Sequence, residues 1–180
     1  MAQLVDALVL NTRAARQCGF ESHPGHNGTH HSGGRRVGIV TTGGASVDPI
    51  DIDALVARAA EARELAYAPY SGFLMGAAAL AGSGRVFQGA LVENVSLGLA
   101  MCPERVAMFS AVAAADPDIV AVVLVAERTD GEITMPCGAC CQVALELGGP
   151  EVRVAAADPS GALTETTIGQ LLPRGPHKTG

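Results

Sequence analysis

The feature that most constrains the fold is the run from Ile119 to Glu127, IVAVVLVAE, which begins with eight consecutive apolar residues. A strand that is apolar at every position, and not only at alternate ones, is typical of burial on both faces. Such a sheet needs a layer of helices on each side. The run therefore predicts a layered α/β domain.

The residues before this run predict one helix and one hairpin. Apolar residues from Ile52 onward follow the 3/4 spacing of a helix, which Pro69 ends. Two short β-like runs, 75–82 and 85–93, are joined by Gly82-Ser83-Gly84, a typical hairpin signal. Residues 94–100 predict a loop.

Helices and strands alternate in the rest of the chain. We expect helices over 102–115 and 137–147, a strand over 151–158 and a short last helix over 167–172. The resulting order is α-β-β-α-β-α-β-α. It predicts a single three-layer α/β/α domain with a mixed β-sheet, with a hairpin first and crossover helices between later strands.

The first 47 residues differ in composition from the rest. Four of the five histidines lie there among Gly, Ser, Thr and Asn, without helical or strand periodicity. We interpret residues 1–47 as a disordered N-terminal tail and residues 48–180 as the folded domain. The run Gly19-Phe20-Glu21-Ser22 can be encoded by bases that resemble the T-arm of a transfer RNA. Two origins stay open: a translation start placed too far upstream, or a lineage-specific extension.

Charge and composition exclude several classes of function. The chain has 12 basic and 18 acidic side chains, a net charge of −6, and residues 48–180 alone carry −8. This charge gives no attraction for phosphate backbones or anionic lipid, and 3% aromatic residues supply few platforms for stacked bases. Neither a membrane-spanning run nor a signal-peptide pattern is present. We expect a cytoplasmic protein that binds neither nucleic acid nor membrane.

Two short motifs carry the chemistry: Cys102-Pro103-Glu104 and Pro136-Cys137-Gly138-Ala139-Cys140. Each places a cysteine at the start of a predicted helix, where unpaired N–H groups and the helix dipole favour the metal-binding thiolate. Cys137 and Cys140 are three residues apart, so both sulfurs project from one helix face. With Cys102 they supply three ligands, the number at a catalytic zinc site that keeps one position for water.

Two charged residues follow Cys102 closely. Glu104 can reach the metal-bound water without binding the metal, and can then act as general base and general acid. Arg105 can donate to a cysteine sulfur and so offset the negative charge of three thiolates around one zinc ion. The alternatives stay open that the cysteines are ordinary buried side chains and that Arg105 is a surface residue.

Residues 65–173 resemble the cytidine deaminases of the small, homotetrameric class with three cysteine ligands. The resemblance runs through five blocks: LAYAPYSGFLMGAAAL, GRVFQGALVENVSLG, MCPERVAMFSAV, MPCGACCQVALE and IGQLLP. It implies the cytidine deaminase fold and the hydrolysis of cytidine and 2′-deoxycytidine to the uridines with ammonia release, a reaction of pyrimidine salvage. It also implies a homotetramer that acts on a small nucleoside.

The resemblance assigns a role to each candidate site residue. It implies that Zn²⁺ is the cofactor and that Glu104 moves the protons. Phe73 would line the base pocket, Glu93 would hold the sugar hydroxyls, and Arg105 would donate to a ligand sulfur. The zinc ligands would be Cys102, Cys137 and Cys140.

The chain departs from the family pattern around the substrate. Leu91 replaces an Asn that reaches the ribose 3′-hydroxyl, and Leu97 replaces a Tyr. Cys141 replaces an Arg after the second metal motif, and we interpret it as an apolar side chain of the helix face. After Pro173 the chain continues as Arg174-Gly175-Pro176, without the Phe that stacks on the base in a neighbouring subunit.

These departures leave two further functions open. One is a deaminase of a modified cytosine nucleoside, similar to the blasticidin-S deaminases, because Leu91 and Leu97 indicate a changed pocket. The other is a zinc-stabilised scaffold that binds nucleosides without turnover. The presence of Glu104 favours an enzyme, because a structural zinc site has no need of a carboxylate there.

Overall fold

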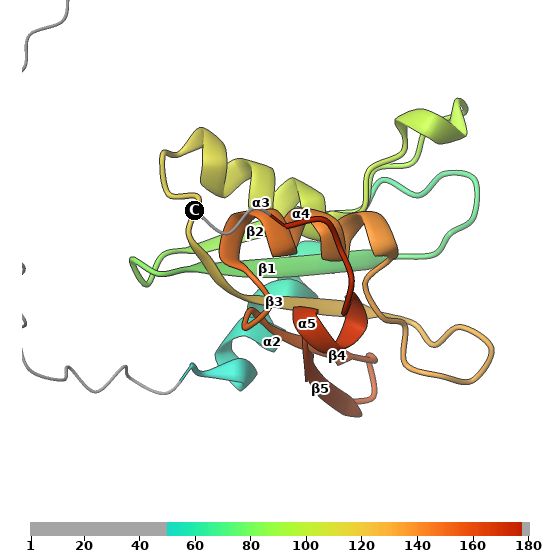
Figure 1. The fold of residues 1–180 in the computed structure, drawn as a ribbon. Helices are drawn as coiled ribbons and strands as arrows, with labels where there is room; N and C mark the ends of the chain where they lie inside the picture. Colours follow the sequence, from blue (N-terminus) through green and yellow to red (C-terminus); the bar gives the residue numbers. More distant parts are fainter. Residues whose placement is uncertain (1–49, 178–180) are drawn as a thin grey trace, which may run out of the picture. The chain divides into compact units, whose positions relative to one another are not determined.

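The computed structural model describes residues 50–177, so the N-terminal tail predicted over 1–47 lies outside the described residues (Figure 1). Among the described residues, no helix has the length and apolar character needed to cross a membrane. The chain forms, in order, α2 (Ile52–Arg63), β1 (Met75–Ala81), β2 (Val86–Ala90), the 3₁₀ turn η1 (Leu97–Leu99), α3 (Pro103–Ala113), β3 (Ile119–Ala126), α4 (Gly138–Gly148), β4 (Arg153–Ala157), β5 (Leu163–Thr167) and α5 (Ile168–Leu171).

The strands form one mixed sheet in the order β2-β1-β3-β4-β5. β1 pairs antiparallel with both β2 and β3, β3 pairs parallel with β4, and β4 pairs antiparallel with β5. The parallel pair is joined through α4, as a crossover connection requires. The mixed sheet predicted from the sequence is therefore confirmed, and its central strand is the apolar run 119–126.

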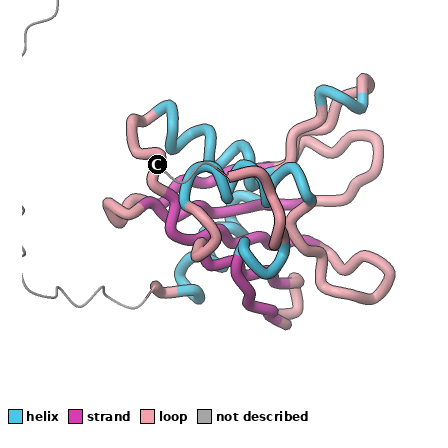
Figure 2. The backbone as a smooth tube through the Cα atoms, viewed as in Figure 1, coloured by secondary structure: helices cyan, strands magenta, loops and turns pink. Residues whose placement is uncertain are grey.

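Helices cover both faces of the sheet (Figure 2). α2 packs on one face, where Leu55 and Ala59 meet Ala78 and Val123 in a buried cluster. α3, α4 and α5 pack on the other face, where a second cluster contains Met108 from α3. The three-layer α/β/α prediction is confirmed by this arrangement.

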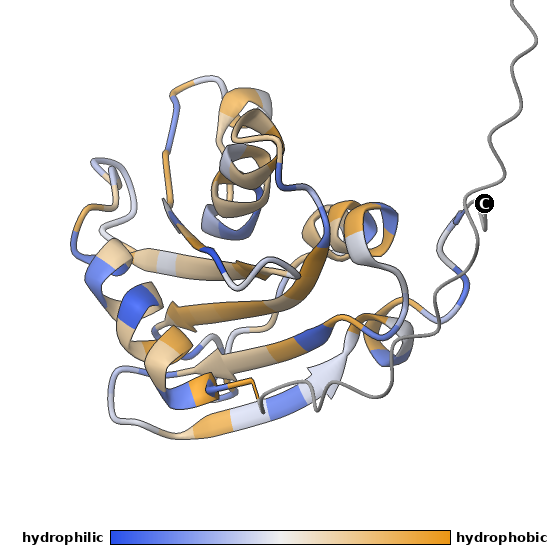
Figure 3. Ribbon diagram, turned by 90° about the vertical axis from the view of Figure 1, so that its left-hand side faces the viewer, coloured by the Kyte–Doolittle hydropathy of each residue, from blue (hydrophilic) through white to orange (hydrophobic). Residues whose placement is uncertain are grey.

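The hydropathy of each strand matches its place in the sheet (Figure 3). Seven of the eight residues of β3 are buried, since the strand is covered on both faces. By contrast, β5 reads LTETT, is largely pale or blue in Figure 3, and has three exposed residues at its start.

The predicted element order is wrong at one place, because it omits β5. This strand has no apolar periodicity that would have revealed it, since it lies at the edge of the sheet and pairs with β4 alone. Residues 94–100, predicted as a loop, contain the single turn η1.

Candidate metal centre

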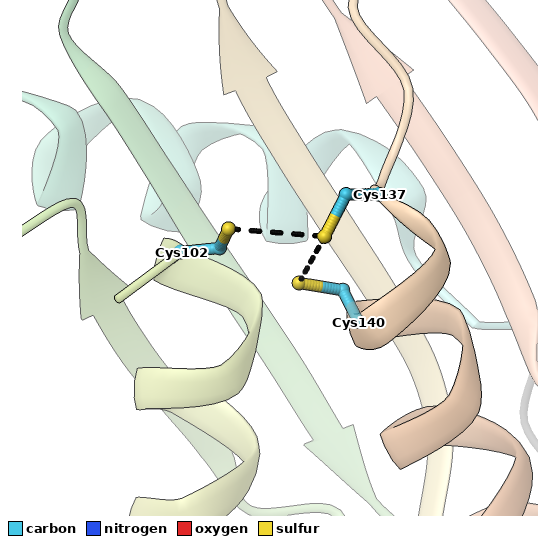
Figure 4. A group of neighbouring side chains, drawn as sticks. All are labelled: Cys102, Cys137 and Cys140. Atoms are coloured by element: carbon cyan, nitrogen blue, oxygen red, sulfur yellow. Dashed lines mark hydrogen bonds between the residues drawn. The ribbon is translucent and has the colours of Figure 1, made fainter. Parts of the chain in front are cut away.

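Two helix starts meet and bring three cysteines together (Figure 4). Cys102 is the N-cap residue of α3, and Cys137 is the N-cap residue of α4, with Cys140 in the first turn of that helix. The Cys102 and Cys137 sulfurs are 3.9 Å apart, and the Cys137 and Cys140 sulfurs are 3.5 Å apart. Within residues 50–177 this is the one group of three or more His, Cys, Asp or Glu side chains whose ligand atoms all lie within 4.8 Å of one another.

The sulfur positions fit a tetrahedral zinc ion. Zinc–sulfur bonds of about 2.3 Å at tetrahedral angles place two sulfurs about 3.8 Å apart. The two sulfur–sulfur distances lie on either side of this value. Three thiols with such spacing could hold a metal ion and would leave one of its four positions free.

Two of the thiols, Cys102 and Cys140, share a proton. The pKa of Cys102 is lowered to about 5, chiefly by hydrogen bonding with the Cys140 thiol and further by the Arg105 guanidinium. The pKa of Cys140 is raised, chiefly because it keeps the proton that it shares with Cys102. Arg105 Nη2 donates to Cys102 Sγ across 3.4 Å. A cation thus stabilises negative charge on the sulfurs, which metal binding requires.

Glu104 is buried next to these thiols, with only 1% of its surface exposed. Its Oε2 atom has no hydrogen-bond partner in the described structure. Burial is the largest cause that raises the pKa of this carboxyl to about 7. A buried polar atom without a partner is costly unless a ligand satisfies it, so Oε2 has the position and the proton affinity of a group that exchanges a proton with a bound molecule.

Cys141 does not join the thiol group. Its side chain is buried in the cluster under α4, and its thiol donates a weak hydrogen bond to the Pro136 carbonyl at 3.6 Å. This agrees with the prediction that Cys141 is an apolar side chain of the helix face.

Glu93 lines a pocket of about 410 Å³. Its carboxylate accepts hydrogen bonds from the Ser71 hydroxyl and from the Tyr70 and Ser71 backbone N–H groups, and these lower its pKa, the hydroxyl most of all. The lining residues are Tyr70, Leu91, Glu93, Asn94, Val95, Leu97 and Ala100.

The two predicted substrate residues, Glu93 and Phe73, are both hydrogen-bonded to Ser71. Glu93 lines the pocket, while Phe73 is half-buried, lies outside its lining, and donates its N–H to the Ser71 hydroxyl. Leu91 and Leu97, the two departures from the family pattern, both line the pocket. Tyr70 and Ser71 were not predicted as partners of Glu93, because two of the donors are backbone N–H groups and the Ser71 hydroxyl is 22 residues away in the chain.

Comparisons with known proteins agree on one family. The family model for the cytidine and deoxycytidylate deaminase zinc-binding region matches residues 31–136. A cytidine deaminase of Halalkalibacterium halodurans is 42% identical over 124 residues, which are 69% of this chain and 92% of that protein. The Mycobacterium tuberculosis cytidine deaminase is 38% identical over 124 residues, 69% of this chain and 88% of that protein.

Solved structures agree with these relatives. The crystal structure of cytidine deaminase from Burkholderia pseudomallei is 46% identical, has a TM-score of 0.64, and is matched over 68% of this chain and 97% of that chain. The Mycobacterium leprae enzyme is 39% identical, with a TM-score of 0.59, over 69% of this chain and 99% of that chain. The chain therefore belongs to the family of cytidine and deoxycytidylate deaminases.

Proposed function

We propose that this protein is a zinc-dependent hydrolase that deaminates cytidine and 2′-deoxycytidine to the uridines and releases ammonia. The observation that carries the proposal is the buried carboxyl of Glu104, with one oxygen unpaired, beside three convergent thiols. Relatives at 38–42% identity are named cytidine deaminases, which gives this site its substrate class.

Cys102, Cys137 and Cys140 hold the zinc ion in this proposal. The bound ion supplies Lewis acidity, which makes a water molecule a good nucleophile near neutral pH. Arg105 donates to Cys102 Sγ and thereby offsets part of the charge of the three thiolates.

Glu104 moves the protons. Its Oε2 atom accepts a proton from the attacking water and then delivers it to the leaving amine. A carboxyl with a pKa of about 7 does both near neutral pH, because neither its protonated nor its ionised form is strongly favoured. Burial of the group, the cause of this pKa, also keeps bulk water from competing for the proton.

Glu93 and Phe73 bind the substrate: Glu93 the sugar hydroxyls and Phe73 the base. Both oxygens of Glu93 already accept hydrogen bonds, which holds the carboxylate in one orientation at the pocket. Leu91 and Leu97 line this pocket with apolar side chains where the family pattern has hydrogen-bonding side chains. This lining supports a second candidate function, deamination of a cytosine nucleoside with a modified, less polar sugar part.

We further propose a cytoplasmic homotetramer that serves pyrimidine salvage. Exposed apolar side chains gather on two segments that are hydrogen-bonded to each other through Tyr67 and Leu91. Large exposed apolar patches mark surfaces that associate, and other copies of the chain would cover this one. Its members are Leu65, Tyr67, Tyr70, Val92, Val95, Leu97 and Leu99.

The test is ammonia release from cytidine by the zinc-loaded full chain. We expect turnover by the wild type, and a loss of about 10²–10⁴-fold in Glu104→Gln with its zinc content unchanged. Glu146→Gln is the matched control, because it makes the same chemical change on the exposed face of α4. A zinc-loaded wild type without cytidine turnover would refute the proposed substrate, and a fully active Glu104→Gln would refute the role of Glu104.

A further inference from the structure

The loop 127–135, between β3 and α4, leads into Pro136 and Cys137 at the metal centre. Figures 1 and 2 show it as a long connection beyond the end of β3. Cys137 is exposed and begins α4 without any side-chain cap hydrogen bond. Its carbonyl accepts a hydrogen bond from the Cys141 N–H, so α4 holds Cys137 from one side and the preceding loop holds it from the other.

The loop is tied together by its own side chains. Arg128 Nη1 donates to the Gly131 carbonyl at 3.0 Å, and Thr134 Oγ1 donates to the Glu127 carbonyl at 2.6 Å. The backbones of Thr129 and Glu132 exchange two hydrogen bonds, of 2.9 and 3.0 Å. These hydrogen bonds close the loop on itself, and Arg128 is bonded to the turn at Gly131.

Asp158 anchors this loop to the sheet. It follows the last residue of β4 and is only 6% exposed. Its Oδ1 atom accepts three hydrogen bonds, from the Ser160 N–H, the Ser160 hydroxyl and the Ala162 N–H. The carboxylate is therefore held in a fixed orientation, and its other oxygen, Oδ2, accepts from Arg128 Nε at 2.6 Å.

The sheet topology explains why Arg128 and Asp158 lie close together. β3 and β4 are parallel neighbours with Val125 opposite Ala157, so both strands end at the same edge of the sheet. Arg128 follows the end of one strand and Asp158 the end of the other. A rigid strand end is thereby connected through one ion pair to the loop that leads into Pro136 and Cys137.

We propose that Arg128 and Asp158 are positioning residues for the metal centre: their ion pair holds the loop 127–135, and with it Cys137, in the geometry that binds zinc. The inference deepens the proposed function, since it rests on the zinc site that function assumes. It assigns neither residue a contact with metal or substrate.

If the ion pair were purely structural, its loss would lower the stability of the fold and leave zinc affinity unchanged. The chain offers a matched control on the same strand. Arg153, the first residue of β4, donates to Glu165 at 2.6 Å, the same distance as in the Arg128–Asp158 pair. It lies at the opposite end of β4 from Asp158, and its partner belongs to the edge strand β5.

The experiment measures zinc affinity of the full chain by competition with a chromophoric chelator, alongside the urea midpoint of each variant. We expect zinc affinity to fall about 10–100-fold in Asp158→Asn and in Arg128→Gln. The zinc affinity of the double variant should be no lower than that of the single variant with the lower affinity, because both changes break the same ion pair. Arg153→Gln should keep wild-type zinc affinity whatever its urea midpoint.

The inference would be overturned if both single variants had zinc affinities within twofold of wild type. It would also be overturned if Arg153→Gln lost as much zinc affinity as they do. If Asp158→Asn does not fold, Arg128→Gln decides alone, because Arg128 is 45% exposed and tolerates the change. The proposed function fails separately: a wild type that binds zinc but does not deaminate cytidine refutes the substrate and leaves the positioning role supported by the zinc measurements.

Discussion

A single methyl group added at Gly89 should lower stability and zinc affinity, although Gly89 is not one of the predicted zinc ligands. Gly89 lies in β2 under the first turn of α3, the helix that carries Cys102 and Glu104. A Cβ atom there would lie 2.2 Å from the Pro103 carbonyl oxygen and 2.5 Å from the Ala107 nitrogen. Both are backbone atoms of the helix, which cannot turn aside as a flexible side chain would.

The cost follows from these distances. Carbon contacts are favourable at about 3.5–4.0 Å, so relief of the clash needs a withdrawal of α3 by about 1 Å. Overpacking of a tight interior costs about 1–3 kcal/mol, and we expect Gly89→Ala to reach about 3 kcal/mol because its contacts are backbone. Metal–ligand distances tolerate only about 0.2 Å, so a shifted Cys102 sulfur should lower zinc affinity by about 10–100-fold.

Urea unfolding and chelator competition on the full chain test this reasoning. Gly98→Ala is the control for stability and zinc affinity, since a Cβ at Gly98 would meet nothing within 4 Å and its φ is not positive. The reasoning is refuted if the free energy of unfolding of Gly89→Ala lies within about 0.5 kcal/mol of the wild-type value and its zinc affinity is unchanged. The close contact with Gly89 would then not set the position of α3.

Three further predictions concern the metal, the substrate pocket and pH. Removal of zinc by a chelator should lower the melting temperature and abolish turnover, and Cys137→Ser should mimic both effects; a melting temperature unaffected by chelation would argue against a bound ion. Leu91→Asn should lower KM for cytidine by about fivefold, as one added hydrogen bond of about 1 kcal/mol allows, with kcat little changed; an unchanged KM would place the sugar elsewhere. The Ser160 hydroxyl and Arg128 hold the pKa of Asp158 well below its usual range. Its contribution to stability is therefore complete above pH about 4 and lost as the pH falls further, so urea midpoints should drop more in wild type than in Asp158→Asn between pH 5 and about 3, and parallel curves would contradict this.

Local patterns were sufficient for most of the fold. The apolar run of β3 predicted a strand covered on both faces, and seven of its eight residues are buried. β5 could not be predicted in this way, because an exposed edge strand of Thr and Glu needs no apolar face and is held by its pairing with β4.

The parts of the candidate site were also visible locally. Cys102, before Pro103, and Cys137, after Pro136, stand at predicted helix starts, and both are N-cap residues in the structure. The pairing of Glu93 with Tyr70 and Ser71, and of Arg128 with Asp158, was not visible, because these partners are 22 to 30 residues apart in the chain.

By itself, therefore, the sequence determined the layered α/β class, the two helix-start cysteine motifs and the carboxylate that follows the first of them. These depend on residue spacing, on capping and on side-chain chemistry, all of which act within a few residues. The tertiary structure decided that the sulfurs of Cys102 and Cys137, 35 residues apart, come within 3.9 Å, and that the nearby Glu104 loses its contact with water. The physical reason is that strand order and helix packing on one face of the sheet bring the two helix starts together, and burial at that junction sets the proton affinity of Glu104.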